Sequence, residues 1–148
     1  MVDFSKKQKE IKDYIKNNFS DFLIKNKMTA PAEFIDDVLD LDEHTKNITV
    51  FYDFESINFD FQSFETQNQK INFEICFVIR NGKSSELKEK SRDYATAFYN
   101  WFYSKECNRN FGGLVDYGTI ETVNFYDAVQ GTKAIKISNL SLVLNLDD

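Results

Sequence analysis

The spacing of apolar residues near the N-terminus predicts an amphipathic helix. Between residues 3 and 24, apolar side chains recur every three, four or seven positions, and lysines occupy the opposite face. The same spacing returns between residues 84 and 104, after Asn81-Gly82, a dipeptide typical of turns. The stripe that this second helix is expected to bury consists of Leu87, Ser91, Tyr94, Phe98, Trp101 and Phe102.

Other apolar segments alternate with polar residues, a pattern that predicts strands. Alternation begins at Ile48 and continues with one slip to Phe64, and it is most regular over residues 71–79. It returns over residues 114–127 and 134–146. In the segment 114–127, one face is expected to carry Val115, Tyr117, Thr119, Val123 and Phe125.

These elements predict an α+β fold in which a mostly antiparallel sheet of four to five strands has two long helices packed on one face. Residues 34–41 are compatible with either a short helix or an irregular strand. With 148 residues, the chain has the size of one domain and can bury a sizeable core. No linker or repeat divides it, so residues 1–148 are expected to form a single α+β domain.

Composition narrows the class of protein. Hydrophobic residues make up 42% and charged residues 28%, which excludes a wholly disordered chain. No apolar run approaches the roughly 20 residues that cross a bilayer, and no apolar stretch follows the charged N-terminus, so neither a membrane span nor a secretory signal is expected. Two cysteines are too few for a disulfide framework. We therefore expect a soluble domain of a reducing compartment, or of an assembly built inside a cell.

Charge is unevenly distributed along the chain. The net charge is −6, which argues against nucleic-acid binding through a basic patch. Residues 30–60 carry nine acids and one lysine, whereas residues 1–29 carry seven lysines and four acids. Such opposite segments suit head-to-tail contact between copies, and they equally suit packing within one chain.

No arrangement of residues points to catalysis. The single histidine, His44, lies among charged residues, and the acids around it lack the spacing of a calcium loop. Glu74 is followed two positions later by Cys76 rather than by the lysine of a metal nuclease. Gly112-Gly113 follows a helix instead of preceding one, so it is not a phosphate loop. The chain is therefore predicted not to be an enzyme, with no catalytic residue, no cofactor and no metal.

Aromatic residues reach 16% of the chain, more than one small core obviously buries. Aromatic side chains are enriched at the buried centres of subunit interfaces. The residues proposed here for an interface are the aromatic Phe59, Phe61 and Phe64, the acidic Asp36, Asp37 and Asp40, and the basic Lys6, Lys9 and Lys16.

The order of elements is similar to that of the tail terminator proteins of long-tailed bacteriophages, also called tail completion proteins. The shared features are an N-terminal amphipathic helix, a strand such as residues 48–54, and a central strand that ends in a polar turn, as in residues 71–82. A helix of about twenty residues with a Ser-rich start and two closing strands, the last over residues 135–146, complete the likeness. It covers almost the whole chain and rests on element order and size, since the family has no invariant motif.

This resemblance implies a structural virion protein that forms a ring, commonly a hexamer, on the head-proximal end of the tail tube and joins it to the neck. Its partners would be other copies of itself and the tube and neck proteins, and DNA would pass through without specific binding. Its location would be the tail or neck of the virion, assembled in the host cytoplasm. The alternatives are another head–tail connector protein, a non-viral small α+β binding module with a pocket under the second helix, and an enzyme that uses Asp and Glu at a shared site.

Overall fold

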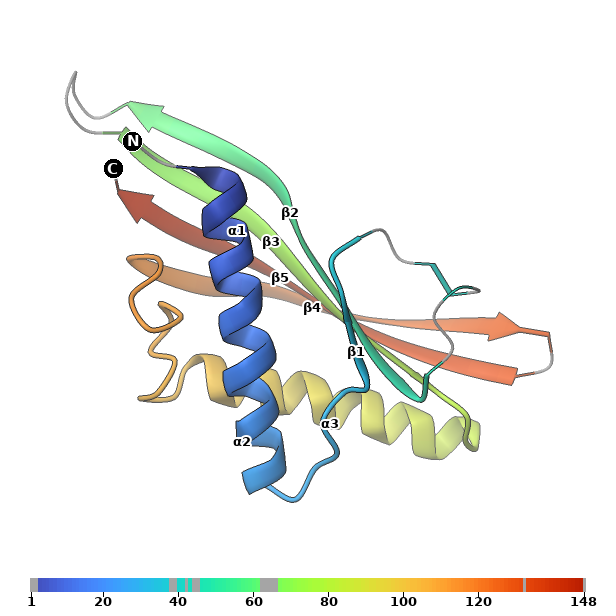
Figure 1. Cartoon of the computed structure of the whole chain (residues 1–148). Coiled ribbons are helices and arrows are strands. Elements are labelled where there is room, and N and C mark those ends of the chain that lie inside the picture. Colours follow the sequence, from blue (N-terminus) through green and yellow to red (C-terminus); the bar gives the residue numbers. More distant parts are fainter. Residues whose placement is uncertain are drawn as a thin grey trace.

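A five-stranded sheet and a set of helices on one of its faces make up the chain (Figure 1). The computed structural model describes residues 3–37, 40–41, 43, 46–61, 67–131 and 133–147, and for residues 60, 61, 67 and 130 it describes the backbone only. The strands are β1 (Glu33–Ile35), β2 (Ile48–Phe61), β3 (Gln67–Arg80), β4 (Tyr117–Gln130) and β5 (Lys133–Asp147). The α+β class predicted from the sequence is confirmed.

The sheet is mixed, with the strand order β1-β2-β3-β5-β4. The pairs β2/β3, β3/β5 and β5/β4 are antiparallel, but β1 pairs parallel with β2, Phe34 lying beside Val50. The sheet of five strands is therefore mostly antiparallel, as expected, with one parallel pair at its edge. In the segment 34–41, which the sequence left open between helix and strand, Phe34 and Ile35 form part of a strand. Asp36 and Asp37 lie beyond its end. Val38 and Leu39, from the same ambiguous segment, lie outside the described residues.

The expectation of two long helices is only half right. The second is one continuous α-helix, α3 (Ser84–Phe102). The N-terminal helical segment is divided into α1 (Phe4–Tyr14), the π-helical η1 (Ile15–Phe19) and α2 (Ser20–Lys25). The wider π-helical turn places one extra residue in the run, which apolar spacing alone does not distinguish from an α-helix. None of the described helices is long and apolar enough to cross a bilayer.

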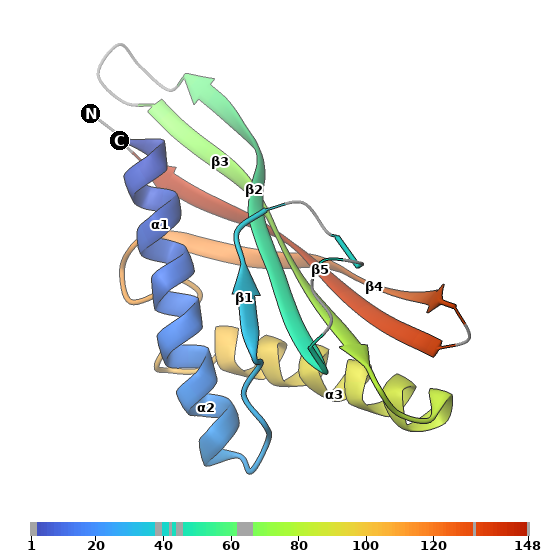
Figure 2. The same ribbon diagram turned by 45° about the vertical axis from the view of Figure 1, so that its right-hand side comes forward.

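The main core lies between the helices and one face of the sheet, here called the inner face. Phe19 of η1 is at its centre, with its ring 5.3 Å from that of Phe98 and 5.4 Å from that of Trp101. The whole stripe predicted for α3 is buried. The N-terminal helices pass across α3 on the same side of the sheet (Figure 1), and Figure 2 shows them at the C-terminal end of α3. Sheet residues that join this core include Val50, Ile71, Phe73, Ile75, Phe77, Leu140, Leu142 and Leu144.

The opposite face of the sheet, here called the outer face, is polar over most of its length. A small second cluster of Phe51, Val78, Ile135 and Ile137 covers one end, and Ile35 and Leu41 pack against it. Along the rest of this face the paired positions carry acids, amides and hydroxyls, among them Asp53, Glu74, Ser141, Asn72, Asn139 and Asn124. The described helices lie on the other side of the sheet (Figures 1 and 2).

The face predicted for residues 114–127 is wrong. A bulge between Ile120 and Thr122 adds one residue to β4, and one extra residue moves every later side chain to the other face. Ile120 and Val123 therefore both point to the main core, although three positions separate them. Tyr117 lies on the outer face and Phe125 on the inner face, so the five residues do not share one surface.

Candidate functional site

The candidate interface residues of the N-terminal helices lie together in one hollow. A hollow of about 700 Å³ lies between α1, η1 and the edge formed by β1 and β2. Lys6, Lys9 and Lys16 line it from the helices, and Asp36 lines it from the residues that follow β1. The structure thus brings basic and acidic candidates together within a single chain. A role for them between two chains stays a prediction.

Lys12, which the sequence did not single out, makes the contact that joins these two charged segments. Its side chain is only 3% exposed, and its ammonium group pairs with Asp36 and with Asp53, the latter at 3.1 Å from Nζ to Oδ1. The ammonium also lies 5.6 Å from the centre of the Tyr52 ring. Part of the opposite charge noticed in the sequence is therefore used for packing within the chain.

The other predicted interface residues are dispersed. Phe59 is half exposed near the end of β2, and its ring makes an edge-on contact with Phe4 at 5.9 Å. Asp37 lines a different hollow, and Asp40 accepts a hydrogen bond from the backbone N–H of Glu43. The Phe61 side chain and all of Phe64 lie outside the described residues.

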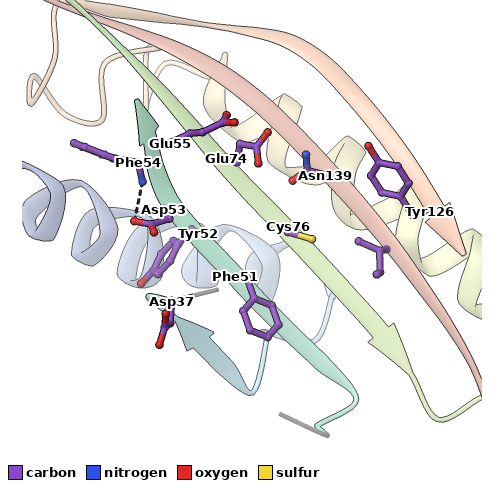
Figure 3. A pocket seen from close by; sticks show the side chains of 11 residues that line it. Asp37, Phe51, Tyr52, Asp53, Phe54, Glu55, Glu74, Cys76, Tyr126 and Asn139 are labelled. Atoms are coloured by element: carbon purple, nitrogen blue, oxygen red, sulfur yellow. Dashed lines mark hydrogen bonds between the residues drawn. The ribbon is translucent and has the colours of Figure 1, made fainter. Parts of the chain in front are cut away.

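A second hollow, of about 510 Å³, opens on the outer face (Figure 3). Its floor includes Phe51, Cys76 and Ile137, and Tyr126 of β4 lies at one end. Four carboxylates also line it, and no lysine or arginine does: Asp37, Asp53, Glu55 and Glu74. Figure 3 shows Glu55, Glu74 and Asn139 side by side on three neighbouring strands. The hollow is therefore acidic, with an apolar floor.

Two of the residues that line this hollow, Cys76 and Tyr52, have raised pKa values. Burial, with the nearby Glu74 carboxylate, raises the pKa of the Cys76 thiol to about 12. Burial, with the nearby carboxylates of Asp13 and Asp36, raises the pKa of Tyr52 to about 12. A thiol with so high a pKa is a poor nucleophile, because the thiolate is the reactive form. The hydroxyl of Ser141 donates a hydrogen bond to Glu74 at 3.2 Å, a contact within the sheet.

The described residues contain no group of three or more His, Cys, Asp or Glu side chains placed to hold a metal ion. His44, the one histidine, lies outside the described part of the chain.

The loop with Gly112 and Gly113 follows α3 and packs against α1, where a Cβ at Gly112 would come 2.8 Å from the Tyr14 ring. Gly112 therefore serves close packing, and both glycines adopt a left-handed backbone conformation.

Both lateral edges of the sheet have open stretches. β4 forms one edge, where Arg109 donates a hydrogen bond to the Gly118 carbonyl and the Ile120 N–H donates one to the Tyr103 hydroxyl, and no described strand pairs with its outward side. At the other edge β1 pairs only with residues 49–51 of β2, so no described strand lies beside β2 from Tyr52 onward. Large exposed apolar side chains gather on β4, where Tyr117, Phe125, Tyr126 and Val129 are each exposed by half or more.

The sequence reasoning missed this open edge. The alternation of residues 114–127 predicts a strand, but it does not show whether that strand has one neighbour or two. One signal was available: β4 contains no lysine, arginine or proline, the residues that commonly protect an edge strand from pairing.

Comparison with known proteins identifies no family for this chain. Neither the scan against protein-family models nor the search of curated proteins returns a match.

Proposed function

We propose that this chain is a structural protein that caps the head-proximal end of a phage or phage-like tail tube as a ring and joins it to the neck. The observation that carries the proposal is the presence of two open sheet edges on opposite sides of one small domain. A protein with two different open edges can bind a copy of itself at each, and such head-to-tail contacts close into a ring when the rotation between copies allows it.

The order of elements also supports the proposal. An N-terminal amphipathic helical segment, a central hairpin, one long helix and a closing hairpin follow one another in the order expected from the tail terminator resemblance. The short β1 is an addition to that order.

The outer face has the chemistry that a DNA passage needs. Asp53, Glu55 and Glu74 line its hollow, and amides and hydroxyls occupy neighbouring positions. Carboxylates repel DNA phosphates, so a duplex passing such a surface would not adhere to it. In this proposal the outer face lines the lumen and the helices lie outside.

The test uses the purified chain and the tail-tube protein encoded nearest to it. By electron microscopy, the chain should form rings with a central opening, and adding rings to polymerising tube protein should give shorter tubes with one capped end. Tubes of unchanged length and no ring at their ends would contradict the proposal. A tail-tube gene beside this one would add support.

A second candidate function, a small-molecule or peptide binding module, is favoured by the acidic hollow with its apolar floor. Such a module would bind a cationic ligand as a monomer. Replacing Glu74 by Gln would then weaken binding of the cationic ligand, whereas ring formation is expected to persist. The expected pocket under α3 is not the one found, because the face of α3 toward the sheet is packed with core side chains.

A further inference from the structure

We propose that β4 of one copy pairs antiparallel with the open part of β2 (residues 55–61) in the next copy, so that the sheet continues from subunit to subunit. This inference rests on the ring of the proposed function and names the surfaces that would form it. The occupant of the β4 edge is therefore a second copy of this chain.

The first argument is that β4 is built to be paired. An exposed strand edge presents a row of unpaired backbone N–H and C=O groups, and proteins usually protect it with lysine, proline or a covering element. β4 has 14 residues without lysine, arginine or proline. One of its two acids, Asp127, is paired with Lys136 of the same chain at 2.7 Å. The stretch from Thr122 to Val129 follows the bulge without further interruption.

The second argument concerns strand direction. Three successive antiparallel pairings separate β2 from β4, so these two strands run in opposite directions within one sheet. A rotation about an axis nearly parallel to the strands brings β2 of the next copy against β4 without reversing either strand. The two then meet antiparallel, and each copy in a ring satisfies both of its edges. A symmetric contact between two β4 strands would leave the edge of β2 open in both copies.

The third argument is the match of side chains on the inner face. Phe59 of β2 is 50% exposed, and Phe125 and Val129 of β4 are 52% and 70% exposed. All three lie on the inner face, because the ladder aligns Phe59 with Gln69 and Phe125 with Ser138, both in register with inner-face positions. Pairing of the two edges would bury these apolar side chains against one another.

The fourth argument is charge. α1 lies beside β2, and its Gln8 and Lys12 side chains reach the strand at Asp53. On this helix Lys6 and Lys9 are exposed, and the β2 segment beside it carries Glu55 and Asp60. β4 carries Glu121 and Asp127, with Lys136 paired to Asp127 and Arg92 over the Phe125 ring. Each edge thus has charges of both signs, and we expect Lys6 and Lys9 of one copy to approach Glu121 of the next.

The test is a mixing experiment with two blocked variants. In the first, Phe125→Lys and Val129→Lys place cations on the β4 edge, where they would face the lysines of α1. In the second, Phe59→Glu places an acid on the β2 edge, where it would face Glu121 and Asp127. The matched control is Ile24→Lys, because Ile24 is 61% exposed and belongs to α2, which is part of neither edge. Circular dichroism checks that each variant is folded, and light scattering after gel filtration gives the mass.

At micromolar concentration the wild type and Ile24→Lys should run as closed oligomers, and each blocked variant alone should run as a monomer. A mixture of the two blocked variants should form a complex containing both, because the intact β4 of one meets the intact β2 of the other. Dimers of Phe59→Glu alone, with no mixed complex, would show a β4–β4 contact and overturn the inference. A monomeric wild type, or oligomers that survive the β4 substitutions, would overturn it as well.

Together with the tail-tube test, this experiment distinguishes the contact between β4 and β2 of neighbouring copies, here called the seam, from the capping role. Rings that respond to the substitutions as expected but leave tail-tube length unchanged would refute the capping role and support the seam. Rings that shorten tubes but are unaffected by the β4 substitutions would refute the seam and support the capping role.

Discussion

Lys12 of α1 reaches across the edge of the sheet to Asp53 of β2, with 3.1 Å between Nζ and Oδ1. The lysine is 3% exposed, while the Asp53 side chain is 53% exposed, so the cation is buried and its partner stays hydrated. Asp36 completes the arrangement from the other side. The contact attaches the N-terminal helix to the strand edge on which the proposed seam is built.

This asymmetry predicts unequal costs for removing the two sides of the ion pair. Lys12→Met keeps the apolar stem and leaves two carboxylates that water can reach, so it should lower the free energy of unfolding by about 1 kcal/mol or less. The double change Asp36→Asn and Asp53→Asn leaves a buried ammonium without an anion and should cost more, about 1–3 kcal/mol. Urea unfolding of the three proteins measures both values. Equal losses would indicate that the ammonium is hydrated.

The core between η1 and α3 should be sensitive to truncation. Phe98 is fully buried against Phe19, Trp101 and Phe102, and Phe98→Ala should cost about 3–5 kcal/mol in the free energy of unfolding. Its neighbour in sequence, Tyr99, is about half exposed and is the matched control, with an expected loss below about 1 kcal/mol. Chemical denaturation compares the two. A small effect at Phe98 would mean that the helices do not pack as described.

Stability should fall at alkaline pH. Burial raises the pKa of Cys76 and Cys107 from 9.0 to about 12, and that of Tyr52 and Tyr94 from 10.0 to about 12. These groups stay protonated in the folded state where they would ionise in the unfolded one. Their contribution is complete below about pH 9 and is lost as pH rises through the folded values near 12. Melting temperatures measured between pH 8 and pH 11 should decline, and Tyr94→Phe should reduce the slope.

Backbone pairing and apolar contact should hold the seam, with charge setting the approach. Raising salt from about 0.05 to about 0.5 M screens exposed charges over a few ångströms and should weaken assembly only modestly. By contrast, replacing Phe59 and Phe61 by Ser should abolish assembly and leave a folded monomer. Sedimentation at the two salt concentrations and of the double variant provides the comparison. Oligomers that dissolve in salt but tolerate the Phe substitutions would show an electrostatic interface instead.

Two strands show where the alternation of apolar and polar residues predicts the buried face correctly and where it does not. In β3, residues 71–79 alternate without a break, and the structure buries Ile71, Phe73, Ile75, Phe77 and Ile79 on the inner face as expected. In β4, the same rule failed after Ile120, because a bulge shifts the phase by one residue. A bulge is decided by pairing with β5, so the residues of β4 alone did not reveal it.

The candidate interface residues could also be predicted from the sequence only in part. The opposite charges of residues 1–29 and 30–60 were visible in composition, but Lys12, the residue that joins them, was not selected. Its burial depends on the parallel pairing of β1 with β2, which brings Asp36 next to α1. Lys6, Lys9 and Lys16 are predicted from their positive charge alone, and the structure places them around the same hollow.

The amino-acid sequence by itself determined the class of fold, the position of the long helix and its buried stripe, and the strong alternation of β3. These depend on the period of apolar residues, which is a local property of the chain. Only the tertiary structure decided the strand order, the parallel β1, the π-helical turn and the two open edges. The reason is physical: which strand lies beside another depends on contacts between residues far apart in sequence, and an edge is defined by the neighbour it lacks.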